Sequence, residues 1–347
     1  MSDPLKIGVI GAGYWGPNLV RNFNQLQDSR VDLVCDLDES RLKHIQSLYP
    51  HVQVSTNYQD ATLSKDLDAV CVATPAHTHY KIAMEALEQG KHVFVEKPMT
   101  ACQREAEEMV AKAAEMGLTL MVDHTFAYAP AVNHIKELIG NGELGKVYYV
   151  NMSRLNLGLI QRDINVIWDL APHDISILCY VLGDYPIRAS AHGNCNILEG
   201  IEDVAMVSLH FPGNVVAFLH LSWLDPCKQR RATFVGSRKM LVYDDVEQLE
   251  KIKIHDKGVE DPPHYDTFGE FQLSYRYGDI SAPYVENQEP LTIECRHFLD
   301  CIKSGDEPIT SGDEGLKIVR VIEACQRSLN LGGQTVDVSV DGIGRMK

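Results

Sequence analysis

The chain has 347 residues, enough for two domains, and its 45% hydrophobic and 23% charged residues are ordinary values for a globular protein. A formal net charge of −16 argues against a surface for nucleic acid or an anionic membrane, because both need a basic footprint. The nine cysteines form no CxxC pair, which favours reduced thiols over a disulfide framework or a zinc site. Without a signal-peptide layout or an apolar run long enough to cross a membrane, we expect a cytoplasmic protein that holds no metal.

Residues 1–124 alternate short apolar runs with helical patterns. Strands that alternate with helices predict right-handed crossovers and a doubly wound parallel sheet, so we expect an N-terminal Rossmann domain over 1–124. The expected strands are 6–10, 31–35, 69–73, 92–95 and 118–122, and the expected helices are 18–24, 39–48, 80–89 and 104–116.

The rhythm changes after residue 125, where strand patterns follow one another without helices between them. This predicts a second α/β domain over 125–347 with a mostly antiparallel open sheet, whose uncovered face invites a homodimer or homotetramer. The expected helices are 131–139, 172–182, 291–303 and 314–330, the expected strands are 146–153, 187–197, 203–211, 214–224, 228–235, 239–244 and 250–255, and the segment 256–288 is expected to be irregular.

The segment 11–16 (GAGYWG) follows the first predicted strand directly and opens a helix at Pro17. In this context the glycines allow a tight turn, a close approach of backbone to a pyrophosphate and close packing of helix on strand. The helix start then offers N–H groups and positive partial charge to phosphates. We expect the cofactor to contact Gly11, Gly13, Tyr14, Trp15 and Gly16.

Asp36 ends the second predicted strand, where its carboxylate can bind ribose hydroxyls. Leu37 follows, with no arginine immediately there for a 2′-phosphate, so NAD is favoured over NADP. Arg41 lies nearby on the next helix and keeps NADP as an alternative.

Two further segments end predicted strands at the edge of the sheet where ligands bind. One carries Thr74 and Pro75, and we expect it to contact the cofactor together with His79, which follows in the next helix. The other carries Glu96 and Lys97, both expected near the cofactor. The ammonium group of Lys97 can polarise a substrate oxygen and stabilise developing alkoxide charge, although a solvated loop lysine is the commoner case.

Asp169 and His173 are four residues apart, which places them on one face of a helix. Because Pro172 suits only a first turn, we expect the helix to begin near it, and His173 then lies close to the positive end of the helix dipole and stays available as a base. The alternative is that Asp169 caps the helix and His173 is structural.

Together these segments resemble the glucose–fructose oxidoreductase, inositol dehydrogenase and rhizopine-catabolism (Gfo/Idh/MocA) family. The resemblance rests on KIGVIGAGYWG, VATP, EKP and a D-x-x-x-H segment, and it covers nearly the whole chain. It implies an NAD-dependent oxidoreductase in which Lys97 and His173 are catalytic and Asp169 supports the histidine. The family commonly has D-x-G-x-H-x-x-D, where this chain has Ala171 for the glycine and Ser176 for the last acid.

The stretch from Arg154 to His173 looks like the branch of the family that acts on nucleotide-linked sugars, typically at C3. The resemblance implies that Asn165 faces the sugar and that Arg154 and Arg162 pair with a diphosphate or carboxylate; a solvated loop is the alternative. His124 and Tyr128 lie where the first domain gives way to the second, and they are expected to be substrate donors or simply packed. Four tyrosines of the irregular segment could stack on a base: Tyr265, Tyr275, Tyr277 and Tyr284.

Three functions therefore stay open. The favoured one is hydride transfer between NAD and C3 of a nucleotide-linked hexose. The second is a dehydrogenase for free sugars or cyclitols such as inositol. The third is a non-catalytic NAD-binding regulator, which would be expected to lose the Lys97 and His173 pair that this chain keeps. A tightly held NAD that is recycled within the enzyme is a further alternative.

Overall fold

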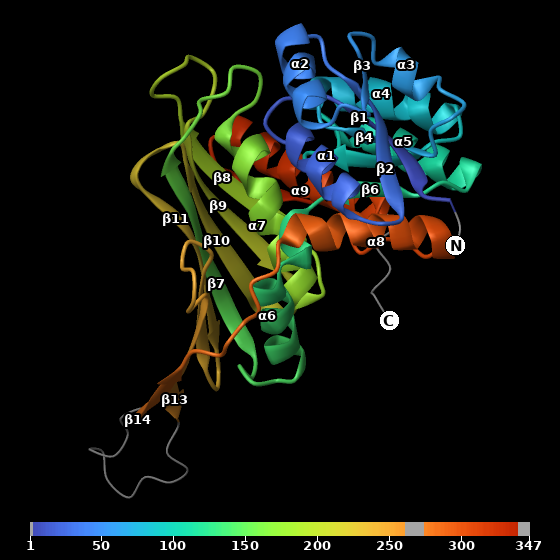
Figure 1. Ribbon diagram of the computed structural model, residues 1–347. Coiled ribbons are helices and arrows are strands. Elements are labelled where there is room, and N and C mark those ends of the chain that lie inside the picture. Colours follow the sequence, from blue (N-terminus) through green and yellow to red (C-terminus); the bar gives the residue numbers. More distant parts are fainter. Residues whose placement is uncertain (1–2, 261–273, 339–347) are drawn as a thin grey trace, which may run out of the picture. The chain divides into compact units, whose positions relative to one another are not determined.

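The computed structural model describes residues 3–260 and 274–338, which form two compact units (Figure 1). The first unit contains the chain up to Ala129 and the segment Gln288–Arg320, and the second contains Pro130–Asn287 and the chain from Val321 onward. The single boundary expected at residue 124 lies close to the first crossing. The expected second domain differs from the second unit, because the chain returns to the first unit at residue 288.

The first unit is built on a parallel six-stranded sheet with strand order β3-β2-β1-β4-β5-β6, which confirms the Rossmann prediction. Its strands are nearly continuous apolar runs, as expected for a sheet that is covered on both faces. The strands are β1 (Leu5–Ile10), β2 (Ser29–Cys35), β3 (Gln53–Ser55), β4 (Ala69–Val72), β5 (His92–Glu96) and β6 (Leu120–Asp123). The helices are α1 (Gly16–Gln25), α2 (Glu39–Leu48), α3 (Gln59–Thr62), α4 (Ala76–Glu88), α5 (Gln103–Met116), the 3₁₀ turn η1 (Thr125–Tyr128), α8 (Pro290–Ser304) and the start of α9 (Gly312–Asn330).

Helix α8, from the far end of the chain, packs beside α1 in the core of this unit (Figure 1). Phe23 of α1, Phe94 of β5 and Phe298 of α8 are fully buried and meet edge to face, with ring centroids 5.5–6.2 Å apart. Burial of rings of this size contributes about 1.5–3 kcal/mol each. This aromatic contact explains why the chain returns to the first unit.

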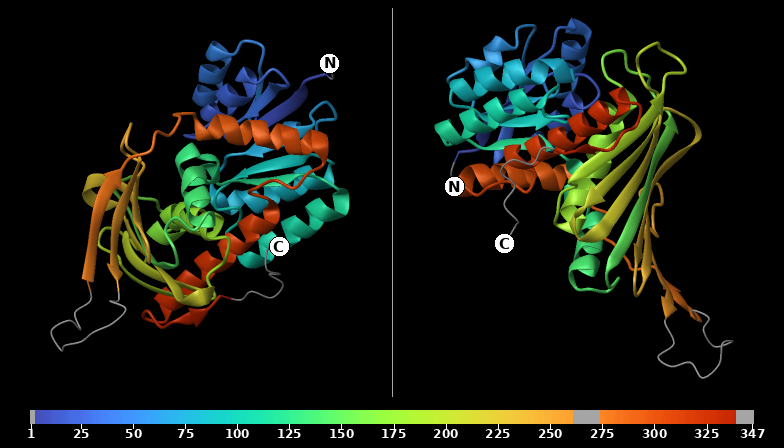
Figure 2. Two further views of the ribbon diagram at one scale, coloured as in Figure 1. Left: turned by 90° about the horizontal axis from the view of Figure 1, so that it is seen from below. Right: turned by 180° about the vertical axis from the view of Figure 1, so that it is seen from behind.

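The second unit is built on a nine-stranded sheet with strand order β14-β13-β12-β11-β7-β10-β9-β8-β15. Only the β7–β10 pair is parallel, so the mostly antiparallel prediction is confirmed. The helices α6 and α7 lie on one face (Figure 1 and Figure 2). The elements are α6 (Pro130–Gly140), β7 (Val147–Leu157), α7 (Val166–Leu182), β8 (Arg188–Asn194), β9 (Val204–Phe211), the 3₁₀ turn η2 (Pro212–Asn214), β10 (Val215–Ser222), β11 (Leu224–Gly236), β12 (Met240–Asp244), β13 (Ile252–Glu260), β14 (Ser274–Ser281) and β15 (Val336–Asp337).

Three expectations about elements were wrong. β3 was missed, since three residues carry too short an apolar pattern to detect. The segment 256–288 is not wholly irregular, because it contains the end of β13 and the whole of β14, which pair with each other. Helix α7 begins at Val166, six residues before Pro172. No helix among residues 3–260 and 274–338 is long and apolar enough to span a membrane.

Candidate active site

The glycine-rich turn between β1 and α1 forms a cradle for a phosphate group. Gly11 has φ +99°, and a Cβ atom added there would lie 2.3 Å from the backbone oxygen of Ala73. A Cβ atom at Gly16 would lie 1.9 Å from the Gly11 carbonyl oxygen, so only glycine lets α1 begin against the turn. At Gly13 a Cβ atom would meet only Nη1 of Arg41, at 3.8 Å, which leaves space beside the backbone. This space fits the pyrophosphate of a dinucleotide.

Two aromatic side chains project from the same turn. Tyr14 and Trp15 are 83% and 37% exposed, and their rings meet edge to face with centroids 5.3 Å apart. Trp15 is the N-cap of α1 and makes no side-chain capping hydrogen bond, and Pro17 stands in the first turn. The N–H groups at the start of α1 are therefore not taken by a side-chain cap.

The carboxylate of Asp36 follows β2 beside the cradle. One oxygen accepts a hydrogen bond from the Ala12 backbone N–H at 2.6 Å, and the other accepts from the backbone N–H of Asp38 at 2.8 Å. Arg41 lies 3.5 Å from the Asp36 carboxylate and 3.6 Å from that of Asp38. Negative charge at this place suits ribose hydroxyls and opposes a 2′-phosphate.

Thr74 and His79 hold the second edge of the expected cofactor site. The Thr78 hydroxyl donates to Oγ1 of Thr74 at 2.6 Å. The ring nitrogens of the buried His79 lie 2.7 Å from the Thr74 carbonyl oxygen and 2.9 Å from that of Pro98. Burial lowers the pKa of His79, so the neutral ring donates from one nitrogen at a time. The ring braces the loops that carry Thr74 and Lys97, and we expect its effect on the cofactor to be indirect. Pro75 is the N-cap of α4.

Lys97 follows β5, is half-buried and joins Pro98 through a cis peptide bond. His124 is 1% exposed, and neither ring nitrogen makes a hydrogen bond within the described part of the chain. Burial and then the charge of Lys97 lower the pKa of His124 to about 3, so its imidazole is neutral. Tyr128 is 3% exposed and its hydroxyl lies 3.0 Å from Oγ1 of Thr310, a contact that favours packing over a role as substrate donor.

In the second unit, Asp169 is held by a tryptophan that the sequence analysis missed. Nε1 of Trp223 donates to Oδ2 of Asp169 at 3.0 Å, and Trp223 is 1% exposed. The Trp223 backbone is fixed on both sides, because its N–H donates to the Asp203 carbonyl and its own carbonyl accepts from Gly158, each at 2.9 Å. Trp223 could have been noticed in the sequence, because this large side chain stands at the end of the predicted strand 214–224.

His173 lies two turns into α7. The expectation that it stands at the helix start was wrong, because Asn165 caps the helix by accepting from two backbone N–H groups of the first turn at 3.2 Å. The dipole of α7 therefore gives no reason for His173 to act as a base, since that effect falls off within the first turn. Ala171 is fully buried within the helix, and the Ser176 hydroxyl donates to the His173 carbonyl oxygen at 2.8 Å.

The two arginines expected at a diphosphate have different surroundings. Nε and Nη2 of Arg154 donate to one oxygen of Asp174 at 2.8 and 2.6 Å, and the residues are 5% and 2% exposed. The charge of Arg154 is thus compensated inside the second unit, which does not fit the expected pairing with a substrate. Arg162 is exposed on the segment before α7.

The side chain of Asn165 is used within its own unit. Besides capping α7, its amide donates to Oε2 of Glu202 at 2.7 Å and to Oε1 of Gln326 at 2.9 Å. These bonds occupy both amide hydrogens, so direct recognition of a sugar by Asn165 has no support in its contacts. Of the four tyrosines, Tyr265 lies outside the described residues, and the other three are exposed: Tyr275, Tyr277 and Tyr284.

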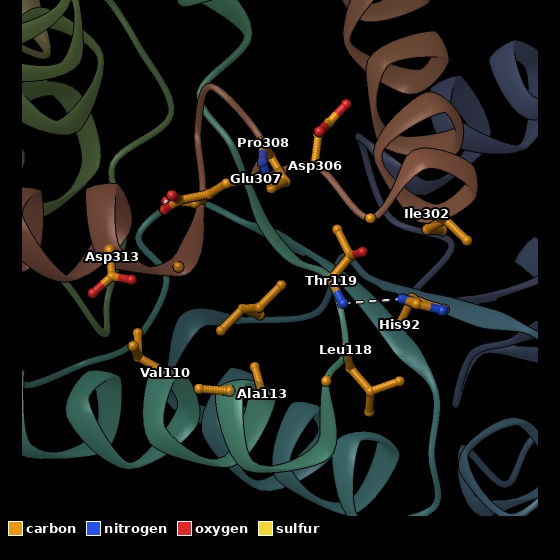
Figure 3. Close-up of a pocket in the computed structure, with 16 residues that line it drawn as sticks. His92, Val110, Ala113, Leu118, Thr119, Ile302, Asp306, Glu307, Pro308 and Asp313 are labelled. Atoms are coloured by element: carbon orange, nitrogen blue, oxygen red, sulfur yellow. Dashed lines mark hydrogen bonds between the residues drawn. The ribbon is translucent and has the colours of Figure 1, made fainter.

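A separate cavity of about 360 Å³ lies at the amino ends of the parallel strands in the first unit (Figure 3). His92 begins β5 there, and Nδ1 of its ring accepts from the Thr119 backbone N–H at 3.0 Å. Dinucleotides bind at the carboxyl ends of such strands, so this cavity is not the cofactor site. The described residues contain no group of three or more His, Cys, Asp or Glu side chains arranged to hold a metal ion.

The glycine cradle between β1 and α1 and the acid after β2 are the features of a dinucleotide-binding Rossmann domain, the class found in nucleotide-dependent oxidoreductases. Comparison with family models agrees: residues 5–124 match an oxidoreductase family with an NAD-binding Rossmann fold, and residues 132–242 match the GFO/IDH/MocA C-terminal domain. The chain belongs to the Gfo/Idh/MocA family of NAD-binding oxidoreductases.

Several named relatives of this chain are sugar and cyclitol dehydrogenases, and another is a 2,7-anhydro-N-acetylneuraminate hydratase of Mediterraneibacter gnavus. The myo-inositol 2-dehydrogenase of Thermotoga maritima is 23% identical over 94% of this chain and 96% of its own length. The D-apiose dehydrogenase of Paraburkholderia graminis is 24% identical over 96% of this chain and 89% of its own length. The structure of a UDP-N-acetylglucosamine 3-dehydrogenase from Acidithiobacillus ferrooxidans matches with a TM-score of 0.78 at 21% identity, covering 95% and 99% of the two chains, and this likeness shows the fold alone.

Proposed function

We propose that this NAD-dependent oxidoreductase transfers a hydride between nicotinamide and C3 of a nucleotide-linked hexose. The observation that carries the oxidoreductase assignment is the Asp169–His173 pair on one face of α7, with Asp169 held by Trp223, in a chain whose other unit has the NAD cradle. The finer assignment to a nucleotide sugar rests on the resemblance of the stretch 154–173 to that branch of the family.

The proposed roles follow from the chemistry of each side chain. His173 removes the proton of the substrate hydroxyl, and Asp169 orients its ring and stabilises the imidazolium that forms. The Lys97 ammonium stabilises the developing alkoxide charge. Bound NAD supplies the hydride acceptor, and Gly11, Gly13, Gly16 and Asp36 would hold it. In the reverse direction His173 returns the proton.

One contact favours the alternative substrate class. Because Asp174 compensates the charge of Arg154, this arginine does not offer its charge to a diphosphate. The ion pair therefore favours a free sugar or cyclitol as the substrate. Arg162 remains exposed, and two further cations lie on β11: Lys228, which is exposed, and Arg230, whose guanidinium lies 3.9 Å from the Asp245 carboxylate. These three side chains are candidates for a diphosphate.

The test compares UDP- and dTDP-linked hexoses, N-acetylated and uronate forms included, with myo-inositol and glucose by NADH production. Binding energy from a remote nucleotide should appear in the transition state, so kcat/KM for the best nucleotide sugar should exceed that of every free polyol by at least about a hundredfold. Arg162→Ala should lower it, and Arg188→Ala, an exposed arginine on β8, is the matched control. Efficient turnover of free polyols, with no binding of any nucleotide sugar by calorimetry, would establish the cyclitol alternative.

We also propose that a second copy of the chain covers the face of the nine-stranded sheet opposite α6 and α7. Tyr149, Met206 and Phe218 lie on three neighbouring strands and are 42%, 53% and 46% exposed. Large apolar side chains gathered on one face support an association of subunits. Sedimentation should show a dimer or tetramer for the wild type and a shift toward monomer for Phe218→Glu; a wild-type monomer would contradict this.

A further inference from the structure

Three carboxyl groups meet inside the first unit, next to Lys97 in the chain. Glu96 ends β5, Asp123 ends β6 and Glu294 lies on α8, and these residues are 6%, 3% and 0% exposed. Glu96 and Asp123 are register partners on the neighbouring strands, and Asp123 lies within hydrogen-bonding reach of both glutamates. We call these three residues the carboxyl cluster.

The carboxyl cluster lacks the donors that three ionised carboxylates would need. One oxygen of Glu96 and both oxygens of Glu294 have no hydrogen-bond donor within the described part of the chain, and the Thr125 hydroxyl donates to Asp123. Two carboxylates at hydrogen-bonding distance are both acceptors, so a proton must lie between them. Burial is the main cause that raises the pKa values of Glu96 and Glu294 well above the ordinary value of a glutamate, and the charge of Asp123 is the second cause.

Among residues 3–260 and 274–338, one cation faces the carboxyl cluster. Lys97 is the cation that acts on Glu96. From the other elements, His124 is neutral and the thiols of Cys71 on β4 and Cys295 on α8 have pKa values raised by burial. Glu96 and Glu294, whose pKa values are raised by burial, are therefore the members of the carboxyl cluster that should hold protons.

We propose that the carboxyl cluster, with protons retained among its carboxyl groups, positions Lys97 and leaves a single negative charge beside the Lys97 ammonium group. Glu96, Asp123 and Glu294 would act on the reaction through Lys97, so they are positioning residues. The inference rests on the proposed catalytic role of Lys97.

The sequence of α8 agrees with this role. Glu294 interrupts the buried apolar face of that helix, whose other buried residues are Leu291, Cys295, Phe298, Leu299 and Cys301. A fully buried acid costs stability unless its charge is removed or compensated. Aromatic packing alone would not require an acid at this position.

The experiment uses Glu294→Gln, because glutamine keeps the shape of a protonated glutamate but cannot ionise. Glu289→Gln is the matched control, since Glu289 stands at the start of the same helix and pairs with Arg21. Infrared spectra of the protein without substrate should show the carbonyl stretch of protonated carboxyl groups at neutral pH, weakened in Glu294→Gln and unchanged in the control. Equal spectra in the wild type and Glu294→Gln, or a metal ion retained in stoichiometric amount, would overturn the proposal.

The pH dependence of folding gives a second readout. The folded-state pKa of Glu294 is raised above the unfolded value of 4.5, so its contribution to stability is full below that value and is lost as pH rises toward the folded value. Each retained proton should lower the folding equilibrium constant by about tenfold per pH unit in this window. Glu294→Gln should remove one such step; an unchanged pH dependence would contradict the proposal. If this variant does not fold, Glu96→Gln, which replaces the other buried glutamate with a raised pKa, serves in the same infrared and folding measurements.

The pH profile of kcat separates positioning from packing. Glu294 acts on Lys97 through Asp123 and Glu96, so Glu294→Gln should displace a limb of the profile by about one pH unit while the Kd for NADH stays unchanged. An identical profile in Glu294→Gln would show that the carboxyl cluster does not act through Lys97. If Lys97→Ala kept full turnover, the proposed function would fail, whereas the infrared result would still stand.

Discussion

The cofactor cradle of the first unit is built from backbone, whereas the Asp169 site of the second unit is built from side chains. Gly11 and Gly16 are fixed because any Cβ atom would collide with a neighbouring carbonyl oxygen. Asp169 is fixed by Trp223, which is 54 residues away in the chain. A backbone site leaves a contiguous motif in the sequence, and a side-chain site brings together residues that no local pattern connects.

The comparison predicts that chemistry and cofactor binding can be separated by substitution, most strongly at Lys97. Lys97→Ala should lower kcat by at least about a hundredfold, because it removes the charge that stabilises the alkoxide. The Kd for NADH should change little, since the glycine cradle is untouched. Steady-state rates measure kcat, and fluorescence titration measures the Kd for NADH. Lys43→Ala, on the exposed face of α2, is the control and should leave kcat and Kd unchanged. A folded Lys97→Ala protein with near wild-type turnover would show that Lys97 is misassigned.

Two glycine variants should distinguish the parts of the cradle. Gly13→Ala should keep the wild-type Tm, because a Cβ atom there meets only Arg41 at 3.8 Å, and should weaken NADH binding by about tenfold to a hundredfold by filling the space for the pyrophosphate. Gly16→Ala should lower Tm even without cofactor, because its Cβ atom would lie 1.9 Å from the Gly11 oxygen. Equal Tm values for the two variants would contradict the geometry of the turn.

Asp36 should set the preference for NAD over NADP. Asp36→Ala removes the carboxylate that opposes a 2′-phosphate and leaves Arg41 without one of its two acid partners. The ratio of kcat/KM values for NAD and NADP should fall by about tenfold or more. A wild-type preference for NADP would contradict the account of this residue.

Substitution of Trp223 should have a smaller effect on catalysis than the substitutions at Lys97, in the glycine cradle and at Asp36. Trp223→Phe keeps an aromatic ring but removes the hydrogen bond to Asp169, so kcat should fall by several-fold, up to about tenfold, which corresponds to the loss of about 0.5–1.5 kcal/mol for a typical hydrogen bond. Tyr80→Phe is the control, because it also keeps an aromatic ring and removes a hydrogen bond to an acid, Glu108, and it should leave kcat unchanged. If Trp223→Phe had wild-type kcat, the hydrogen bond would be irrelevant to the orientation of Asp169.

Local patterns predicted most of the first unit. Helix α2 was predicted at 39–48 and lies at Glu39–Leu48, because the acidic cap, apolar spacing and following turn agree. The start of α7 was missed because Pro172 outweighed the capping signal of Asn165, and β14 was missed because an edge strand needs a partner to be recognised. Arg154 and Glu294 were misjudged or missed for one reason: the burial of a charged side chain depends on distant elements that pack around it.

The most direct test of whether cofactor binding and catalysis depend on separate residues uses one sample of the His173→Ala variant. The Kd for NADH and the turnover of the best substrate are measured together on this protein. We expect the Kd to stay within about twofold of the wild type, while turnover falls by at least about a hundredfold, as for the loss of a positioned acid–base group. Turnover close to the wild type, or a loss of NADH binding as large as the loss of turnover, would contradict the account.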